Sequence, residues 1–68
     1  MRYTMKPKQT FPDALKDWRA QYRFTQAAAA RALGRTLRTF QNWEQGRLPR
    51  ADTQAVILAR LQTFGGVR

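Results

Sequence analysis

The sequence predicts an all-α protein, a compact domain of four helices. Apolar residues recur at helical spacing in four segments, and glycine or proline residues separate those segments. No segment alternates between apolar and polar residues as a half-buried strand does. With 68 residues, of which 43% are hydrophobic and 12% aromatic, the chain suffices for one small core. We therefore expect a single folded domain.

The composition is strongly basic. The chain has 13 Lys and Arg residues and four Asp and Glu residues, which gives a formal net charge of +9. It has no Cys and no His. Disulfides, Cys or His zinc sites, thiol nucleophiles and imidazole bases are thereby excluded. The composition argues against an enzyme and predicts no cofactor or metal. A domain this basic favours a polyanionic partner, and nucleic acid is the first candidate.

The N-terminal residues 1–9 show no helical or strand period and carry three positive charges. We interpret them as a flexible basic arm in which Lys6 and Lys8 reach phosphates. The alternative is a terminus that contacts nothing. No run approaches the roughly 18 apolar residues that span a bilayer, and no apolar signal stretch follows residue 1. We expect a cytoplasmic protein without membrane contact.

The first helix is predicted to start after Thr10, whose hydroxyl can cap it, with Asp13 in the first turn. One helical face carries apolar side chains at i, i+3 and i+7: Leu15, Trp18 and Tyr22. Phe24 is expected to close the helix. Aromatic rings on an inner face pack in the core, although Trp18, Tyr22 and Trp43 have the alternative role of base-stacking platforms.

Two short helices are predicted next. Thr25 precedes an alanine-rich run over 26–33, which Gly34 ends, and Thr36 caps a third helix from Leu37 to about Gln45. Its inner face carries Phe40 and Trp43. After a basic loop over 47–50, a fourth helix runs from residue 51 or 52 to Thr63. Its apolar side is formed by Val56, Ile57, Leu58 and Leu61. The domain thus covers 10–64, and residues 65–68 form a frayed end.

The second and third helices describe a helix-turn-helix, in which two short helices meet across a turn that contains glycine. Ala30 lies where the helices cross, and Gly34 supplies the positive φ of the turn. Phe40 and Trp43 hold the third helix on the core. Its outward residues are then Leu37, Arg38, Gln41 and Asn42, the face that enters a DNA major groove in such motifs.

A wider set of residues resembles the Cro and lambda-repressor type, or XRE family, of DNA-binding domains. The matching stretches are Leu15–Arg19, Phe24–Gln26, Ala30, Leu33–Gly34, Thr36, Phe40, Trp43–Arg47 and Pro49. The segment 37–47 is similar to short autorepressors and HigA-like antitoxins, and the resemblance covers about residues 11–61. It implies a lambda-repressor-like fold in a bacterial or phage-infected cell. Arg35 departs from the apolar residue that is usual in its turn position.

The resemblance also implies roles in DNA binding. Leu37, Arg38 and Asn42 match positions that read base edges: a thymine methyl for Leu37, guanine for Arg38 and adenine for Asn42. Gln41 lies on the same face and is a further candidate for reading bases, although it could contact a phosphate instead. The remaining candidates are phosphate contacts, which include both lysines of the arm: Gln26, Arg35, Thr36, Thr39, Arg47, Arg50, Lys6 and Lys8. The resemblance implies that Gln26 also braces the third helix.

Glu44 lies among arginines, where a carboxylate repels phosphate. The family pairs this residue with an arginine of the first helix, and Arg19 occupies the matching position. The resemblance therefore implies a structural ion pair that fastens the first helix to the end of the third.

The sequence predicts a sequence-specific repressor of transcription, an autoregulatory homodimer on an inverted repeat of double-stranded DNA. The family's fifth helix has no counterpart here, which leaves the dimer interface open. The alternative is an antitoxin that neutralises a toxin protein and binds DNA secondarily. Such a role needs spare apolar surface, and few residues outside the expected core can supply it: Met1, Tyr3, Met5, Phe64 and Val67. A third alternative is binding to RNA or non-specific binding to nucleic acid. It would need exposed aromatic residues or a basic stripe without a base-reading face, and the face formed by Leu37, Arg38 and Asn42 argues against it.

Overall fold

The computed structural model describes residues 8–64, which form four helices and no strand. They are α1 (Phe11–Gln21), α2 (Gln26–Ala32), α3 (Leu37–Glu44) and α4 (Ala51–Thr63). The all-α prediction is confirmed for this part of the chain. Most of the predicted arm, with Lys6, and the predicted C-terminal end lie outside the described residues. The longest helix of the described residues, α4, has 13 residues, and none is both long and apolar enough to cross a membrane.

Threonine side chains start the first three helices. Thr10, Thr25 and Thr36 each accept a hydrogen bond on Oγ1 from the backbone N–H three residues ahead, at 3.1–3.2 Å. These bonds satisfy N–H groups that have no partner within the helix. Helix α4 differs, because its N-cap residue Arg50 makes no side-chain cap bond.

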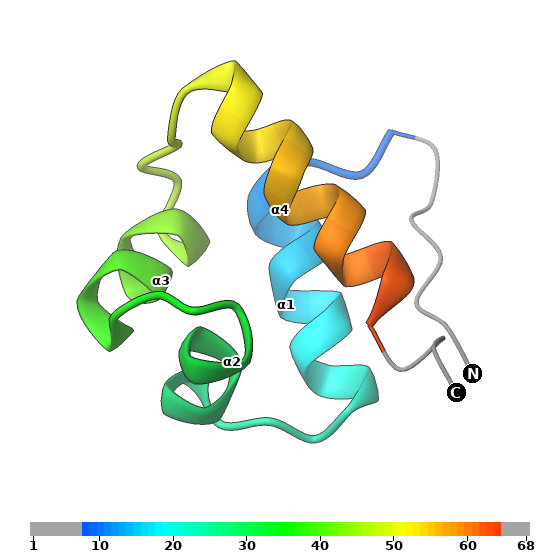
Figure 1. The fold of residues 1–68 in the computed structure, drawn as a ribbon, viewed down its shortest axis with the longest axis vertical. Helices are drawn as coiled ribbons and strands as arrows, with labels where there is room; N and C mark the ends of the chain where they lie inside the picture. Colours follow the sequence, from blue (N-terminus) through cyan, green and yellow to red (C-terminus); the bar gives the residue numbers. More distant parts are fainter. Residues whose placement is uncertain (1–7, 65–68) are drawn as a thin grey trace.

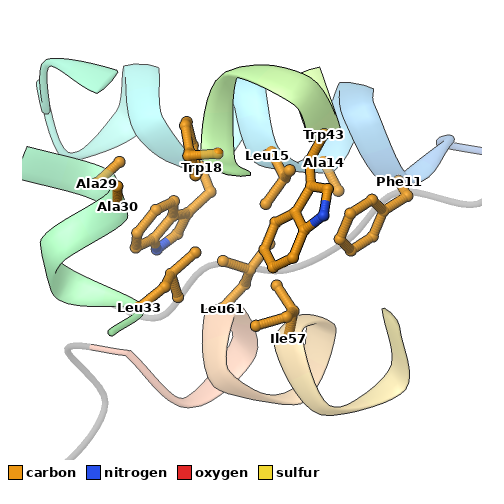
Figure 2. Packing of buried hydrophobic residues seen from close by; sticks show 11 residues of the cluster. Phe11, Ala14, Leu15, Trp18, Ala29, Ala30, Leu33, Trp43, Ile57 and Leu61 are labelled. Carbon is orange, nitrogen blue, oxygen red and sulfur yellow. The ribbon is translucent and has the colours of Figure 1, made fainter. Parts of the chain in front are cut away.

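Helix α1 is central to the packing. It contacts α3 and α4, and α2 packs on α3 (Figure 1). The core is formed by residues from all four helices and from the α2–α3 turn: Phe11, Ala14, Leu15, Trp18, Ala29, Ala30, Leu33, Phe40, Trp43, Ile57 and Leu61. In Figure 2, Trp18 lies beside Ala30 and Leu33, while Trp43 lies beside Phe11. The Phe11 and Trp43 ring centroids are 5.7 Å apart in an edge-on arrangement.

The end of α1 confirms the prediction for Phe24. Helix α1 ends at Gln21, and the chain bends at Arg23, which takes a positive φ of 58°. The Phe24 N–H donates to the Arg19 carbonyl at 2.9 Å and the Arg23 N–H to the Ala20 carbonyl at 3.1 Å, and these bonds close the helix end. The bend turns the Phe24 ring back onto Trp18, with ring centroids 5.3 Å apart. Phe64 packs on the same indole at 5.4 Å. We call Trp18, Tyr22, Phe24 and Phe64 the aromatic cluster; it joins the end of α1 to the end of α4.

Val56 corrects a prediction, since it lies outside the buried side of α4. Ile57 and Leu61 are fully buried, one helical turn apart, whereas Val56 is 50% exposed. Successive helical residues are rotated by about 100°. A helix that turns Ile57 toward α1 therefore turns its neighbour Val56 toward the surface.

Candidate nucleic-acid interface

The turn between α2 and α3 is fixed by backbone hydrogen bonds. Gly34 has a φ of +71°, and the Arg35 N–H donates to the Ala30 carbonyl at 2.8 Å. A non-glycine residue at Gly34 would be strained by its φ, although space for a Cβ is present. Ala29 and Ala30 are buried where α2 meets α3, and their small side chains permit a close approach. The two helices are therefore held in one relative position.

Helix α3 has two distinct sides. Phe40 and Trp43 are buried against the core, and on the other side Arg38 is exposed and Leu37 is 42% exposed. Gln41 and Asn42 are half-buried. The four predicted base-reading residues are thus accessible to different degrees. An exposed leucine beside an arginine offers an apolar contact next to a planar hydrogen-bond donor.

A chain of polar side chains joins α1, α2 and α3 at the side of this helix. Arg19 donates to Glu44 through Nε, at 2.8 Å from Oε2, and through Nη2, at 3.3 Å from Oε1. Gln26 Nε2 donates to Glu44 Oε1 at 2.8 Å. Gln41 Nε2 donates to Gln26 Oε1 at 3.2 Å. We call Arg19, Glu44, Gln26 and Gln41 the polar chain.

The polar chain orders the groups around a buried carboxylate. Glu44 is only 5% exposed, and a buried carboxylate is tolerated when it is paired and hydrogen-bonded. Because Glu44 only accepts hydrogen bonds, it turns the NH₂ of Gln26 toward itself. The Gln26 carbonyl then faces Gln41 and accepts from it. The Arg19–Glu44 pair implied by the resemblance is present. Gln26 also braces α3, as the resemblance implies, through bonds with Glu44 and Gln41.

The predicted phosphate contacts fall into two groups. Arg47 and Arg50 are exposed in the α3–α4 loop, whose start is fixed by a bond from the Arg47 N–H to the Asn42 carbonyl at 2.9 Å. Thr36 and Thr39 are already engaged, because the Thr36 hydroxyl donates to Thr39 Oγ1 at 3.0 Å and accepts from its N–H. Lys8 is exposed before α1.

Arg35 occupies a different place from the other predicted phosphate contacts. Its guanidinium carbon lies 5.8 Å from the centroid of the Trp43 ring, within the range of a cation–π contact. Arg35 also lines an open hollow with Asp52, Thr53 and Val56 of α4. Its guanidinium therefore lies toward α4, and its phosphate contact stays a prediction.

The carboxylates within residues 8–64 lie away from the exposed side of α3. Asp13 and Asp17 are on α1, where Asp17 Oδ2 accepts from Gln21 Nε2 at 3.4 Å. Glu44 is buried in the polar chain, and Asp52 lies 3.9 Å from Arg50 at the start of α4. The exposed side of α3 thus presents one cation and no carboxylate among the described residues. This distribution suits contact with an anionic surface.

No family model, no curated protein and no solved structure matches this chain. The properties of the site therefore follow from its residues and their arrangement.

Proposed function

We propose that the protein is a sequence-specific repressor that binds double-stranded DNA through a helix-turn-helix of the lambda-repressor-like type, formed by α2, the Gly34 turn and α3. The observation that carries this proposal is the two-sided nature of α3. Phe40, Trp43 and Glu44 fasten one side to the domain, and the opposite side leaves Leu37 and Arg38 exposed. A rigidly held helix with an exposed reading side is what major-groove recognition requires.

The exposed side carries chemistry that distinguishes bases. The Arg38 guanidinium offers two parallel donors that match O6 and N7 of guanine, and the Asn42 amide matches N6 and N7 of adenine. Leu37 has no hydrogen-bonding group, so its match is the thymine methyl. Gln41 has one amide hydrogen committed to Gln26, and its carbonyl and second amide hydrogen can bind a base or a phosphate.

The phosphate contacts would set the position of α3 on the duplex. Arg47 and Arg50 flank the end of α3 and the start of α4, and α4 begins without a side-chain cap. The Thr53 N–H in the first turn of α4 already donates to Asp52 Oδ1 at 2.8 Å, so the arginines and not the helix end would hold a phosphate. Two exposed arginines there form a clamp for the DNA backbone.

Repression would follow from occupation of the DNA. The described residues, 8–64, form four helices, and no group of His, Cys, Asp and Glu side chains among them could hold a metal ion. A homodimer on an inverted repeat at its own promoter would exclude other proteins from that site. The autoregulatory part of the proposal rests on the resemblance in 37–47.

The antitoxin alternative receives less support from the described residues. The sequence offered Phe64 as part of a surface for a toxin, but its ring packs on Trp18, Tyr22 and Phe24 and its carbonyl accepts from the Tyr22 hydroxyl at 3.1 Å. The large apolar side chains exposed outside the reading side within residues 8–64 are Leu48 and Val56. They are few for a stable protein interface of about 1,600 Å².

Selection from a pool of random duplexes tests the proposal. The protein should enrich an inverted repeat, and the Arg38→Ala variant should lose the preference for a guanine at one position of each half-site. Thr63→Ala is a matched control, because Thr63 is exposed at the end of α4 and bonds only carbonyls of its own helix. Failure to enrich any sequence, with the domain folded, would overturn the proposed function.

A further inference from the structure

The outward side of α4 carries a short apolar centre between two opposite charges. Val56 is 50% exposed, Asp52 lies four residues before it and Arg60 four residues after it, and both charged residues are exposed. Residues four apart lie on the same side of a helix. We call Asp52, Val56 and Arg60 the α4 face. The alanines beside it, Ala55 and Ala59, are exposed and leave room for another backbone.

The two charges of the α4 face make only local contacts within the described residues: Asp52 Oδ1 accepts from the Thr53 N–H at 2.8 Å and lies near Arg50. The Asp52 side chain is 76% exposed, and its ion pair with Arg50 is 3.9 Å long with both partners in solvent. Such an exposed ion pair contributes little to the free energy of unfolding. Asp52 is also the exposed carboxylate nearest to the proposed phosphate clamp, where it repels DNA. A carboxylate in this place therefore suits contact with a protein better than contact with a nucleic acid.

We infer that the α4 face binds the same face of a second copy of the chain, with the two α4 helices antiparallel and Val56 at the two-fold axis. A two-fold interface brings together residues at equal distances on either side of its centre. With Val56 at the centre, Asp52 of each copy meets Arg60 of the other. The two apolar side chains meet at the axis, and the interface contains two opposite-charge pairs.

The charges identify a second copy as the occupant. The chain as a whole has a net charge of +9, so two copies repel each other over most of their surfaces. The α4 face carries one acid and one base at equal distances from Val56, so an antiparallel second copy places each acid opposite a base. The hollow lined by Arg35, Asp52, Thr53 and Val56 lies beside it and can accept part of the facing helix.

The interface leaves the proposed reading side of α3 uncovered. Helix α4 packs on α1, and α3 packs on α1 and α2 (Figure 1). A contact of this size lies well below the roughly 1,200 Å² of stable complexes, so we expect a weak dimer that DNA strengthens. The inference extends the proposed function, because it names the surface through which two copies would occupy an inverted repeat.

Cross-linking in the absence of DNA tests the interface and does not depend on DNA binding. The chain has no cysteine, so Val56→Cys introduces a single reactive thiol. A short bismaleimide should link this variant into a covalent dimer. Ala20→Cys, at an exposed position of α1, is the matched control and should be linked only at the rate of random collision. Equal yields from the two variants would overturn the inference and leave the proposed DNA binding untouched.

Charge reversal then tests the pairing. In the Val56→Cys chain, Asp52→Arg places two cations on each face, and Arg60→Asp places two anions on each face. Each variant alone should be cross-linked roughly tenfold less, because like charges meet across the axis. An equimolar mixture should restore the yield, with mass spectrometry identifying heterodimers. Circular dichroism checks that both variants fold, and a mixture without preferential heterodimers would show that Asp52 does not face Arg60.

Discussion

The aromatic cluster and the polar chain hold the same helix by different physical means. Trp18 and Arg19 are neighbours on α1, yet Trp18 is fully buried among rings and Arg19 reaches the Glu44 carboxylate. In the aromatic cluster one polar atom, Trp18 Nε1, is buried without a hydrogen-bond partner. In the polar chain every carboxylate oxygen has a donor. A core held by apolar burial tolerates one polar atom without a hydrogen-bond partner, whereas a buried charge requires partners for its polar atoms.

This comparison suggests a division of roles. The aromatic cluster has rings on α1 and α4 and on the segments that follow them, so it should set the stability of the domain. The polar chain ends at Gln41 on α3, so it should set the position of the proposed reading side. Four predictions test this division, from the largest expected effect to the smallest.

Removing the central ring should have the largest effect. Trp18→Ala deletes a fully buried indole that contacts three other rings, and such a truncation costs about 3–5 kcal/mol. A small domain has a free energy of unfolding of similar size, so we expect a largely unfolded protein at 25 °C. Circular dichroism and urea titration measure the loss. A cooperative transition close to that of the parent would show that the aromatic cluster does not set stability.

Removing the buried carboxylate should come next. Glu44→Ala leaves the Arg19 guanidinium and the Gln26 amide without their acceptor, at a cost of about 3 kcal/mol. Glu44→Gln is the matched variant, since it keeps the shape but replaces one acceptor oxygen with an NH₂ group, which cannot accept from Arg19 or Gln26. We expect the order parent, Glu44→Gln, Glu44→Ala in the urea midpoint. An unchanged midpoint for Glu44→Ala, with tighter DNA binding, would contradict a structural role for the pair.

Features of the fold and the candidate site that depend on residues close in the sequence could be predicted, and features that depend on packing between distant segments could not. The threonine caps, the glycine at the turn and the burial of Phe40 and Trp43 depend on residues within one or two helical turns, and these predictions are confirmed. Val56 was placed wrongly, because the rotation of α4 about its axis follows from packing against α1, which is distant in the sequence. The resemblance implied that Gln26 braces α3, but its particular partners, Glu44 and Gln41, depend on how α2 packs on α3, and no spacing in the sequence indicates them.

The proposed reading side supplies the third prediction, which separates specificity from affinity. Arg38→Ala should cost about 1–3 kcal/mol on the selected site and little once its guanine is replaced. Arg47→Ala should weaken binding to selected and scrambled duplexes equally and reduce the salt slope by about 1. Titration of both variants against both duplexes at fixed salt measures this. Parallel losses for Arg38→Ala would make Arg38 a backbone contact.

The smallest effect concerns a single hydroxyl and separates packing from hydrogen bonding in the aromatic cluster. Tyr22 Oη donates to the Phe64 carbonyl at 3.1 Å, while its ring stacks on Phe24 with centroids 5.9 Å apart. Tyr22→Phe removes the hydroxyl and keeps the ring, so we expect a loss of only about 1 kcal/mol. Tyr22→Leu, which also removes the ring contacts, should cost clearly more in the same urea titration. DNA affinity of both variants should be unchanged under conditions where they are folded, because Tyr22 lies outside the polar chain. If instead Tyr22→Phe destabilised the domain as much as Tyr22→Leu, the cluster would depend on a directional bond, as the polar chain does, and the contrast between the two regions would not hold.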